Sequence, residues 1–128
     1  MTQSIATIAL VVSDYDEAIA FYRDTLGFVV VADTPLGGGK RWVLVAPGAG
    51  GARLLLAVAE GEAQRARIGD QTGGRVGFFL ETDDFERDFA LYSARGVRFL
   101  EAPRHEAYGS VAVFEDLYGN KWDLIQPR

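Results

Sequence analysis

Apolar and polar residues follow two different periods near the start of the chain, and the change of period separates two predicted elements. The run Ile5–Val12 is apolar and rich in β-branched residues, which predicts a strand covered on both faces. Asp14 stands where a helix N-cap accepts hydrogen bonds, and Gly27 ends the helical spacing as a C-terminal glycine does. We therefore expect a strand and then an amphipathic helix, whose buried face is formed by Tyr15, Ala18, Ile19, Tyr22 and Leu26.

The second half of the chain repeats this order. Residues 77–97 carry the apolar run, acidic helix start, amphipathic stretch and glycine stop of residues 8–28. The second helix is predicted to begin after Asp83 or Asp84 and to end at Gly96. After each helix the spacing of turns predicts strands, namely Phe28–Asp33, Arg41–Ala46 and Arg53–Ala59, then Val97–Ala102, Ser110–Glu115 and Lys121–Gln126.

Each repeat is therefore a predicted βαβββ module. A module with one helix leaves the other face of its sheet uncovered, so the two sheets are expected to associate. We predict an α+β fold in which two tandem modules form a cupped, mostly antiparallel eight-stranded sheet with the helices on its convex side. We expect one domain, 1–128, formed by modules 4–59 and 75–126. The linker between them, 60–74, would contain a helical turn over Glu62–Ile68. A ligand is expected in the cup.

Composition excludes several classes of protein and site. The chain has 128 residues, the length of one domain, and 18 acidic against 13 basic residues give a net charge of −5, which argues against nucleic acid as a partner. With no cysteine and one histidine, disulfide scaffolds, thiolate zinc sites and thiol nucleophiles are excluded. No signal-peptide pattern and no run of about 20 apolar residues is found, so we expect a cytoplasmic protein without a membrane partner.

Two segments carry a resemblance to a known family. They are TIALVVSDYDEAIAFYRDTLGF at 7–28 and FEDLYGNKWDL at 114–124. Together with the repeat, they resemble the glyoxalase / bleomycin resistance / extradiol dioxygenase superfamily, whose members are also called vicinal oxygen chelate proteins. The resemblance implies paired βαβββ modules and often a homodimer. It does not imply one reaction, since the family includes metal-dependent isomerases, lyases, thiol transferases and dioxygenases as well as metal-free drug-binding proteins.

The resemblance also implies where a metal would be bound. Metal-dependent relatives place His, Gln or Glu on the first and last strands of each module, and the matching positions here are Thr7, about Leu54, Gly77 and Asp123. Only Asp123 is a credible ligand, and one carboxylate holds a divalent ion weakly. We therefore predict that the usual metal site is absent and that no cofactor is bound; a divalent metal is what the family otherwise implies.

Two carboxylates are candidates for catalysis. The two-residue period of a strand places Glu81, with Gly77 and Phe79, on the cup side of its strand, and Asp123, with Lys121 and Ile125, on the cup side of another. Burial in an apolar cup raises the pKa of a carboxyl, so Glu81 or Asp123 is a candidate general base. In the alternative interpretation, Glu81 ends its strand in solvent and Asp123 pairs with Lys121 or an arginine.

Further residues are candidates for binding a ligand. Arg104, His105, Glu106 and Tyr108 cluster in one predicted turn, where Arg104 or Tyr108 would hold a polar group of the ligand. Trp42 and Phe79 would offer aromatic surfaces, giving the binding set Trp42, Phe79, Arg104 and Tyr108. Alternatively, His105 is a solvated surface residue, Tyr108 anchors a hairpin and Trp42 packs in the core.

These residues support two hypotheses about function. In the first, the protein binds a small, partly apolar molecule, as a drug-sequestering resistance protein does, without turnover. In the second, it is a metal-independent or weakly metal-assisted isomerase or lyase in which Glu81 or Asp123 is the base and Arg104 or Tyr108 stabilises an oxyanion. The two hypotheses differ in whether Glu81 and Asp123 converge.

Overall fold

The structure is a computed structural model that describes residues 2–48 and 50–128. Its contacts divide the chain into two compact units, Met1–Ile68 and Gly69–Arg128. Each unit repeats the order of elements predicted from the sequence, a strand, a helix and then further strands. The α+β class and the paired βαβββ organisation are thereby confirmed.

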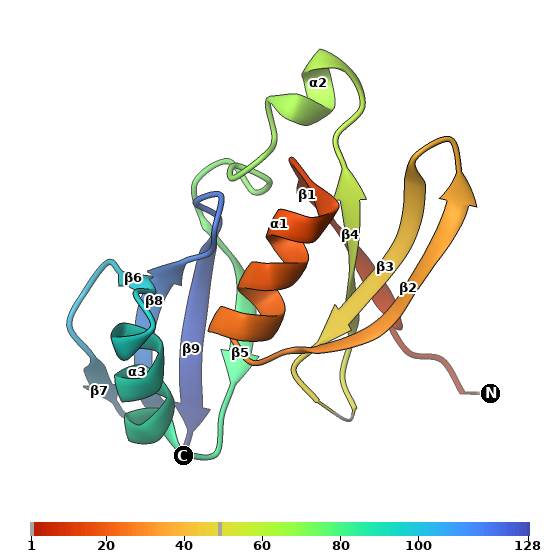
Figure 1. Ribbon diagram of the computed structural model, residues 1–128. Helices are drawn as coiled ribbons and strands as arrows, with labels where there is room; N and C mark the ends of the chain where they lie inside the picture. Colours follow the sequence, from red (N-terminus) through yellow and green to blue (C-terminus); the bar gives the residue numbers. More distant parts are fainter. Residues whose placement is uncertain (1, 49) are drawn as a thin grey trace. The chain divides into compact units, whose positions relative to one another are not determined.

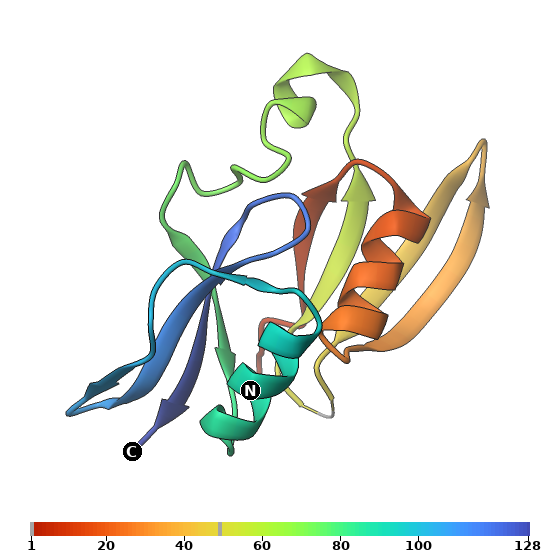
Figure 2. The ribbon, with the colours of Figure 1, turned by 60° about the vertical axis from the view of Figure 1, so that its left-hand side comes forward.

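The first unit is a four-stranded sheet with a helix on one face (Figure 1). The strand order is β1-β4-β3-β2, in which β1 and β4 are parallel and the other neighbours are antiparallel. Figure 2 shows α1 lying across β4 and β3. Its elements are β1 (Thr7–Val12), α1 (Tyr15–Ala20), the π-helical turn η1 (Phe21–Thr25), β2 (Val29–Gly37), β3 (Lys40–Ala46), β4 (Arg53–Val58) and α2 (Gly61–Arg65).

The first helix begins and ends where the sequence predicts. The Asp14 carboxylate accepts a hydrogen bond from the Glu17 backbone N–H at 2.8 Å, so it caps a helix end that otherwise leaves this donor unpaired. Gly27 follows the last turn with φ 77°, a conformation that glycine adopts without a steric penalty. Four of the five predicted face residues, Ala18, Ile19, Tyr22 and Leu26, are buried.

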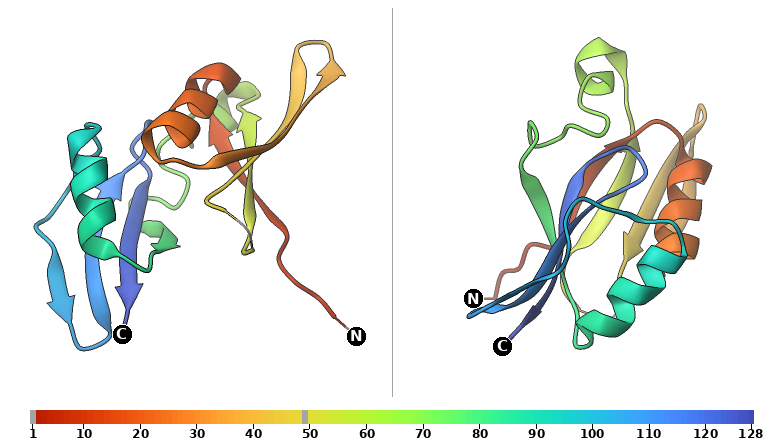
Figure 3. Two further views of the ribbon diagram at one scale, coloured as in Figure 1. Left: turned by 60° about the horizontal axis from the view of Figure 1, so that its bottom comes forward. Right: turned by 90° about the vertical axis from the view of Figure 1, so that its left-hand side faces the viewer.

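The second unit is a five-stranded sheet with α3 on one face of β8 and β9 (Figure 3). The strand order is β5-β9-β8-β6, with β7 also paired to β8, and β5 and β9 are parallel. Asp84 caps α3 by accepting a hydrogen bond from the Arg87 N–H at 3.1 Å. The elements are β5 (Val76–Glu81), α3 (Phe85–Ala94), β6 (Arg98–Phe99), β7 (Arg104–Glu106), β8 (Gly109–Glu115) and β9 (Lys121–Pro127).

Aromatic side chains fill the space between α3 and this sheet. Tyr92 of α3 meets Phe114 of β8 edge to face, with 6.0 Å between ring centroids. Phe114 in turn stacks on Trp122, and Trp122 stacks on Phe78 at 4.7 Å. The helix-facing side of β5, β8 and β9 is therefore the core of this unit.

The strand count differs from the prediction, because the described residues form nine strands in two sheets rather than eight strands in one sheet. The predicted strand Val97–Ala102 is reduced to β6, and a further strand, β7, follows it. Phe99 pairs with Phe114 and Arg104 with Val111, so four residues, 100–103, lie opposite only two on β8. Pro103 within this segment has no N–H to donate to a ladder, which explains the interruption.

The predicted linker 60–74 is divided between the units. Its first part forms α2 within the first unit, and its last part packs on the β8–β9 turn of the second. The buried Asp116 carboxylate organises this turn by accepting hydrogen bonds from the backbone N–H groups of residues 118–120 and from the Trp122 indole N–H at 3.2 Å. Asn120 Oδ1 then accepts a hydrogen bond from the Gln71 N–H at 3.2 Å. Among the described residues, no helix is long and apolar enough to cross a membrane.

The close approach of Gly69 to this turn yields a first prediction. A Cβ atom on Gly69 would lie 1.9 Å from the Tyr118 carbonyl oxygen, and the residue has φ +76°. Gly73 has a similar φ, +70°, but open space around its Cβ position. We expect Gly73→Ala to lower the free energy of unfolding by about 1–2 kcal/mol, the cost of a left-handed alanine, and Gly69→Ala to lower it by a further ~1–3 kcal/mol, the cost of overpacking. Urea denaturation measures both, and equal losses would contradict the clash.

The buried Tyr92 yields a second prediction. Burial raises the pKa of its hydroxyl to about 12, and the neighbouring Asp88 charge adds to the effect. Above pH 10 the unfolded chain releases this proton while the folded chain retains it, so the folded state loses stability as the pH rises from 10 to 12. Between pH 9 and pH 11 the wild type should lose about 1.4 kcal/mol more than Tyr92→Phe, which has no proton to release. Urea denaturation at both pH values checks this, and parallel losses would contradict it.

Candidate functional site

The two faces of the second unit's sheet differ in what covers them. Tyr92 of α3 contacts Phe114, which identifies the face that α3 covers. Residues paired across strands share a face, as do residues two positions apart along a strand. The opposite face is called the α3-distal face below. It carries one row of side chains formed by Glu81, Ile125, Val111 and Arg104, and a second row formed by Phe79, Asp123 and Val113.

Asp123 has an unusual environment within this face. Its neighbours across the strands are Phe79 on β5 and Val113 on β8, so its carboxyl lies among apolar groups. The Oδ1 atom is enclosed and has no hydrogen-bond partner among the described residues. Burial raises the pKa of the Asp123 carboxyl, the charge of Arg104 opposes this effect, and the charge of Glu101 adds to it. The alternative of an ion pair with Lys121 or an arginine is not found within the described residues.

Glu81 does not share the environment of Asp123. It is exposed, and its cross-strand neighbour is Ile125. Glu81 and Asp123 therefore lie on adjacent strands of one face but in different rows, which separates them by two residues along the strand direction. The exposure of Glu81 agrees with the interpretation in which this residue ends its strand in solvent.

Arg104 is held by groups from its own segment. Its Nε atom donates to the two Glu101 carboxylate oxygens at 3.0 and 3.1 Å. Its Nη1 atom donates to the Tyr108 hydroxyl at 3.4 Å and to Glu106 at 3.5 Å. These hydrogen bonds, first that to Tyr108 and then that to Glu101, raise the pKa of the Arg104 guanidinium. Arg104 and Tyr108 are therefore brought together as predicted, although part of the guanidinium is already occupied.

Glu101 is the residue that sequence reasoning missed. Its Oε2 atom accepts a hydrogen bond from the Val113 N–H at 3.1 Å, at the point where the ladder between β8 and its neighbour is interrupted. The same carboxylate binds Arg104. Pro103, directly after the predicted strand Val97–Ala102, was the available signal, because a proline interrupts strand pairing and a neighbouring N–H group then needs another acceptor.

His105 lies apart from the cluster in which the sequence placed it. Successive residues of a strand point to opposite faces, so His105 of β7 is directed away from the face of Arg104 and Glu106. Its ring meets Phe85 of α3 edge to face at 6.4 Å, and its Nδ1 atom lies 2.8 Å from the Ser110 hydroxyl. The predicted cluster of four is thus corrected to Arg104, Glu106 and Tyr108. His105 is an exposed residue on the α3 side, as the alternative interpretation held.

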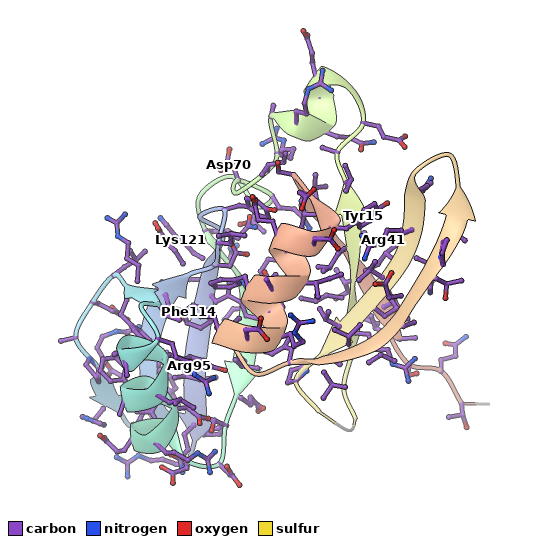
Figure 4. The ribbon with its side chains drawn as sticks, in the orientation of Figure 1. Tyr15, Arg41, Asp70, Arg95, Phe114 and Lys121 are labelled. Carbon is purple, nitrogen blue, oxygen red and sulfur yellow. The ribbon has the colours of Figure 1, made fainter. Side chains whose placement is uncertain are left out.

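Trp42 marks the corresponding face of the first unit. Its neighbour Arg41 lies on the α1 side, where its guanidinium binds Asp16 at 2.9 Å and Asp33 at 2.7 Å and lies over the Tyr15 ring (Figure 4). Alternation then places Trp42 on the opposite side, the α1-distal face, together with Leu44 and Leu55. Trp42 is 42% exposed, so the alternative that it packs in the core is wrong.

The four positions that the resemblance assigns to metal ligands do not fit a metal ion. In the first unit, Leu54 is buried on the α1 side and pairs with Ile8. Thr7 precedes Ile8 on the same strand, so its side chain lies on the opposite face from Leu54. In the second unit, Gly77 falls at a register shift between β5 and β9 and supplies no side chain, which leaves Asp123. One hydroxyl and one carboxylate fall short of the ligand sets of zinc, calcium or magnesium. Among the described residues, no three His, Asp or Glu side chains form a group that could hold a metal ion.

Comparisons with known proteins agree with this architecture. The model of the Glyoxalase/Bleomycin resistance protein/Dioxygenase superfamily matches residues 4–124. A protein of Shewanella frigidimarina (strain NCIMB 400), described as uncharacterized, is 54% identical, with 98% of this chain and 95% of that protein covered. The crystal structure of TnmS3, an antibiotic binding protein from Streptomyces sp. CB03234, is 32% identical over 99% of this chain and 98% of its own, with a TM-score of 0.79. A glyoxalase/bleomycin resistance protein from the same organism is 34% identical over 96% of this chain and 100% of its own, with a TM-score of 0.74.

The environment of Asp123 yields a third prediction. The pKa of Asp123 is higher in the folded chain than in the unfolded chain. At a pH just above the ordinary pKa of aspartate, the folded chain therefore holds a proton that the unfolded chain has released. The free energy of unfolding falls as the pH rises through this range. Replacing the carboxylate by a neutral amide removes this penalty. We therefore expect Asp123→Asn to raise the free energy of unfolding at pH 7, and we expect the gain to disappear at pH 3.

Urea denaturation of Asp123→Asn at the two pH values measures this difference. Glu81→Gln is the matched control, because Glu81 is an exposed carboxylate on the same face of the same sheet. Its stability relative to the wild type should be almost the same at both pH values. A loss of stability in Asp123→Asn at pH 7 would contradict the assignment of a buried, unpaired carboxyl.

Proposed function

Because the chain belongs to the glyoxalase/bleomycin resistance protein/dioxygenase superfamily, we propose that it binds a small, partly apolar molecule and sequesters it without turnover. Each unit offers a sheet face that its helix leaves uncovered. The proposed contact residues are Trp42 on the face of the first unit and Phe79, Arg104 and Tyr108 in the second. The proposal requires no metal and no cofactor. It makes the protein a drug- or metabolite-binding member of a family that also contains enzymes.

The observation that carries the proposal is the exposure of large aromatic side chains on these faces. Trp42 on the α1-distal face is 42% exposed, and Phe79 on the α3-distal face is 63% exposed. Burying apolar area of this kind against a ligand is favourable by about 25 cal/mol per Å², and apolar surface with a few polar groups is typical of small-molecule sites. The similarity to TnmS3, an antibiotic binding protein, supports the same class of ligand.

The arrangement of the polar groups favours binding over catalysis. General acid–base catalysis commonly uses two groups that reach one substrate, and Glu81 is exposed and one row away from Asp123. The Nε atom of Arg104 is already bound to Glu101, which reduces its capacity to stabilise a developing oxyanion. Catalytic roles for Glu81 and Asp123 stay predictions of the enzyme hypothesis.

The proposal includes a homodimer, which this family often forms, and a location in the cytoplasm. Size-exclusion chromatography with light scattering measures the mass directly. We expect twice the mass of one chain. The mass of a single chain at micromolar concentration would contradict this part of the proposal and leave the binding of a ligand unaffected.

Trp42 yields the prediction that tests binding. Nile red is a neutral, polycyclic aromatic dye whose fluorescence rises in apolar surroundings, so it is a suitable probe. We expect saturable binding to the wild type and a dissociation constant about tenfold higher for Trp42→Ala, which corresponds to a loss of about 1.4 kcal/mol. A large exposed aromatic side chain of a binding site contributes on this scale.

Leu91→Ala is the control for nonspecific adsorption of the dye. Leu91 is 40% exposed, close to the value for Trp42, but it lies on α3 rather than on a sheet face. Its removal should leave the dissociation constant unchanged. Equal effects of the two substitutions, or the absence of saturable binding to the wild type, would contradict the proposed function.

A further inference from the structure

We propose that the α3-distal face selects aromatic ligands that carry a hydrogen-bond donor, a hydroxyl or an N–H group, and that the Asp123 carboxyl accepts this hydrogen bond while the ligand ring packs on Phe79. The inference rests on the proposed function and adds a chemical class of ligand to it. It assigns to Asp123 the role of a specificity-determining acceptor.

The unmet hydrogen-bonding capacity of Asp123 is the first observation. The residue is half-buried, its Oδ1 atom is enclosed, and no described residue donates to that atom. Buried polar groups in proteins are almost always paired, and leaving one unpaired costs free energy. Because Oδ1 is enclosed, a ligand donor reaches this carboxyl at Oδ2, which also accepts no hydrogen bond from a described residue, so the new bond displaces no partner within the protein.

The second observation explains why the neighbouring cations leave Asp123 unpaired. Arg104 is the basic residue whose charge acts on Asp123, and Glu101 binds its Nε atom with both carboxylate oxygens. Tyr108 and Glu106 bind its Nη1 atom. Lys121 lies two residues from Asp123 on β9 and forms no ion pair with it within the described residues. Glu101 therefore acts as a positioning residue that keeps Arg104 from neutralising Asp123.

The charges of this face disfavour an anionic ligand. Glu81, Glu106 and Glu115 belong to the same face as Asp123, and Glu101 lies beside Arg104. The two arginines of this face are already paired with these carboxylates, Arg98 with Glu115 and Arg104 with Glu101 and Glu106. Like charges repel most strongly in a partly buried site. The group recognised by Asp123 is therefore a donor and not a carboxylate or phosphate.

Phe79 supplies the apolar part of the same site. It is the direct neighbour of Asp123 on the adjacent strand and is 63% exposed. Adjacent strands are about 4.8 Å apart, a spacing that a ring substituent and a hydrogen bond of about 2.8 Å can span together. A ring packed on Phe79 thus places a hydroxyl or N–H substituent within reach of the Asp123 carboxyl.

Two probes that differ in the replacement of a hydroxyl hydrogen by a methyl group test the inference. 2-Naphthol carries a hydroxyl, and 2-methoxynaphthalene carries the same oxygen without its hydrogen. Equilibrium dialysis against the full chain gives a dissociation constant for each. We expect the wild type to bind 2-naphthol on the order of tenfold more tightly than 2-methoxynaphthalene, the scale of a hydrogen bond to a charged group. In Asp123→Ala this ratio should fall to about one.

The ether is also the control for folding, because Asp123→Ala should bind it about as tightly as the wild type does. Phe79→Ala should weaken the binding of both probes and keep their ratio. Glu86→Ala removes an exposed carboxylate from α3 and should change neither constant. 2-Naphthoate, the anionic analogue, should bind more weakly than 2-naphthol.

The outcomes separate this inference from the proposed function. If the wild type binds both probes equally, or if the preference for 2-naphthol persists in Asp123→Ala, the role of Asp123 is wrong and the apolar site stands. Tighter binding of 2-naphthoate than of 2-naphthol would also overturn the inference, because it assigns recognition to the basic residues. If neither neutral probe nor Nile red binds the wild type, the proposed function fails with it.

Discussion

The Glu101 carboxylate replaces a hydrogen bond that the second sheet loses between β6 and β7, where the pairing of the chain with β8 is interrupted. It accepts the Val113 N–H at 3.1 Å and, with the same oxygens, fixes the Arg104 guanidinium. An unpaired N–H in that place would cost free energy, and a guanidinium free to move would pair with the nearest carboxylate. One side chain thus completes the sheet and leaves Asp123, the neighbour of Val113 on β9, available for another donor.

The opposite side of the same strands has a different role. Asp116 fixes the turn between β8 and β9 through the backbone N–H groups of residues 118–120 and the Trp122 indole, and Trp122 stacks between Phe78 and Phe114. Asp123 directly follows Trp122, so this anchoring sets which face the Asp123 side chain occupies. A rigid core on one side of β9 is the reason that a polar group on its other side has a defined position.

The family shares its fold among proteins of different chemistry, and in this chain the difference lies in a few positions. Where metal-dependent relatives are expected to place ligands, Gly77 and Leu54 supply none, and Asp123 is a single carboxylate. A carboxylate without a metal or an ion pair is a hydrogen-bond acceptor in partly apolar surroundings. Under the proposed role of Asp123, the same position in the fold serves a different recognition chemistry.

Local patterns in the sequence determined the order of elements, the helix caps and the faces of the helices, because capping, helical spacing and glycine stops depend on residues within one turn of each other. Asp14, Gly27 and the buried face of α1 are examples. The two-residue period also assigned Asp123 to its face of β9. The two-residue period of a strand does not determine which strands are neighbours, where the register of their pairing shifts, or which side chains are in contact. Tertiary structure decided these features. It separated His105 from Arg104 and brought Glu101 to Val113, because strand pairing joins residues distant in the sequence.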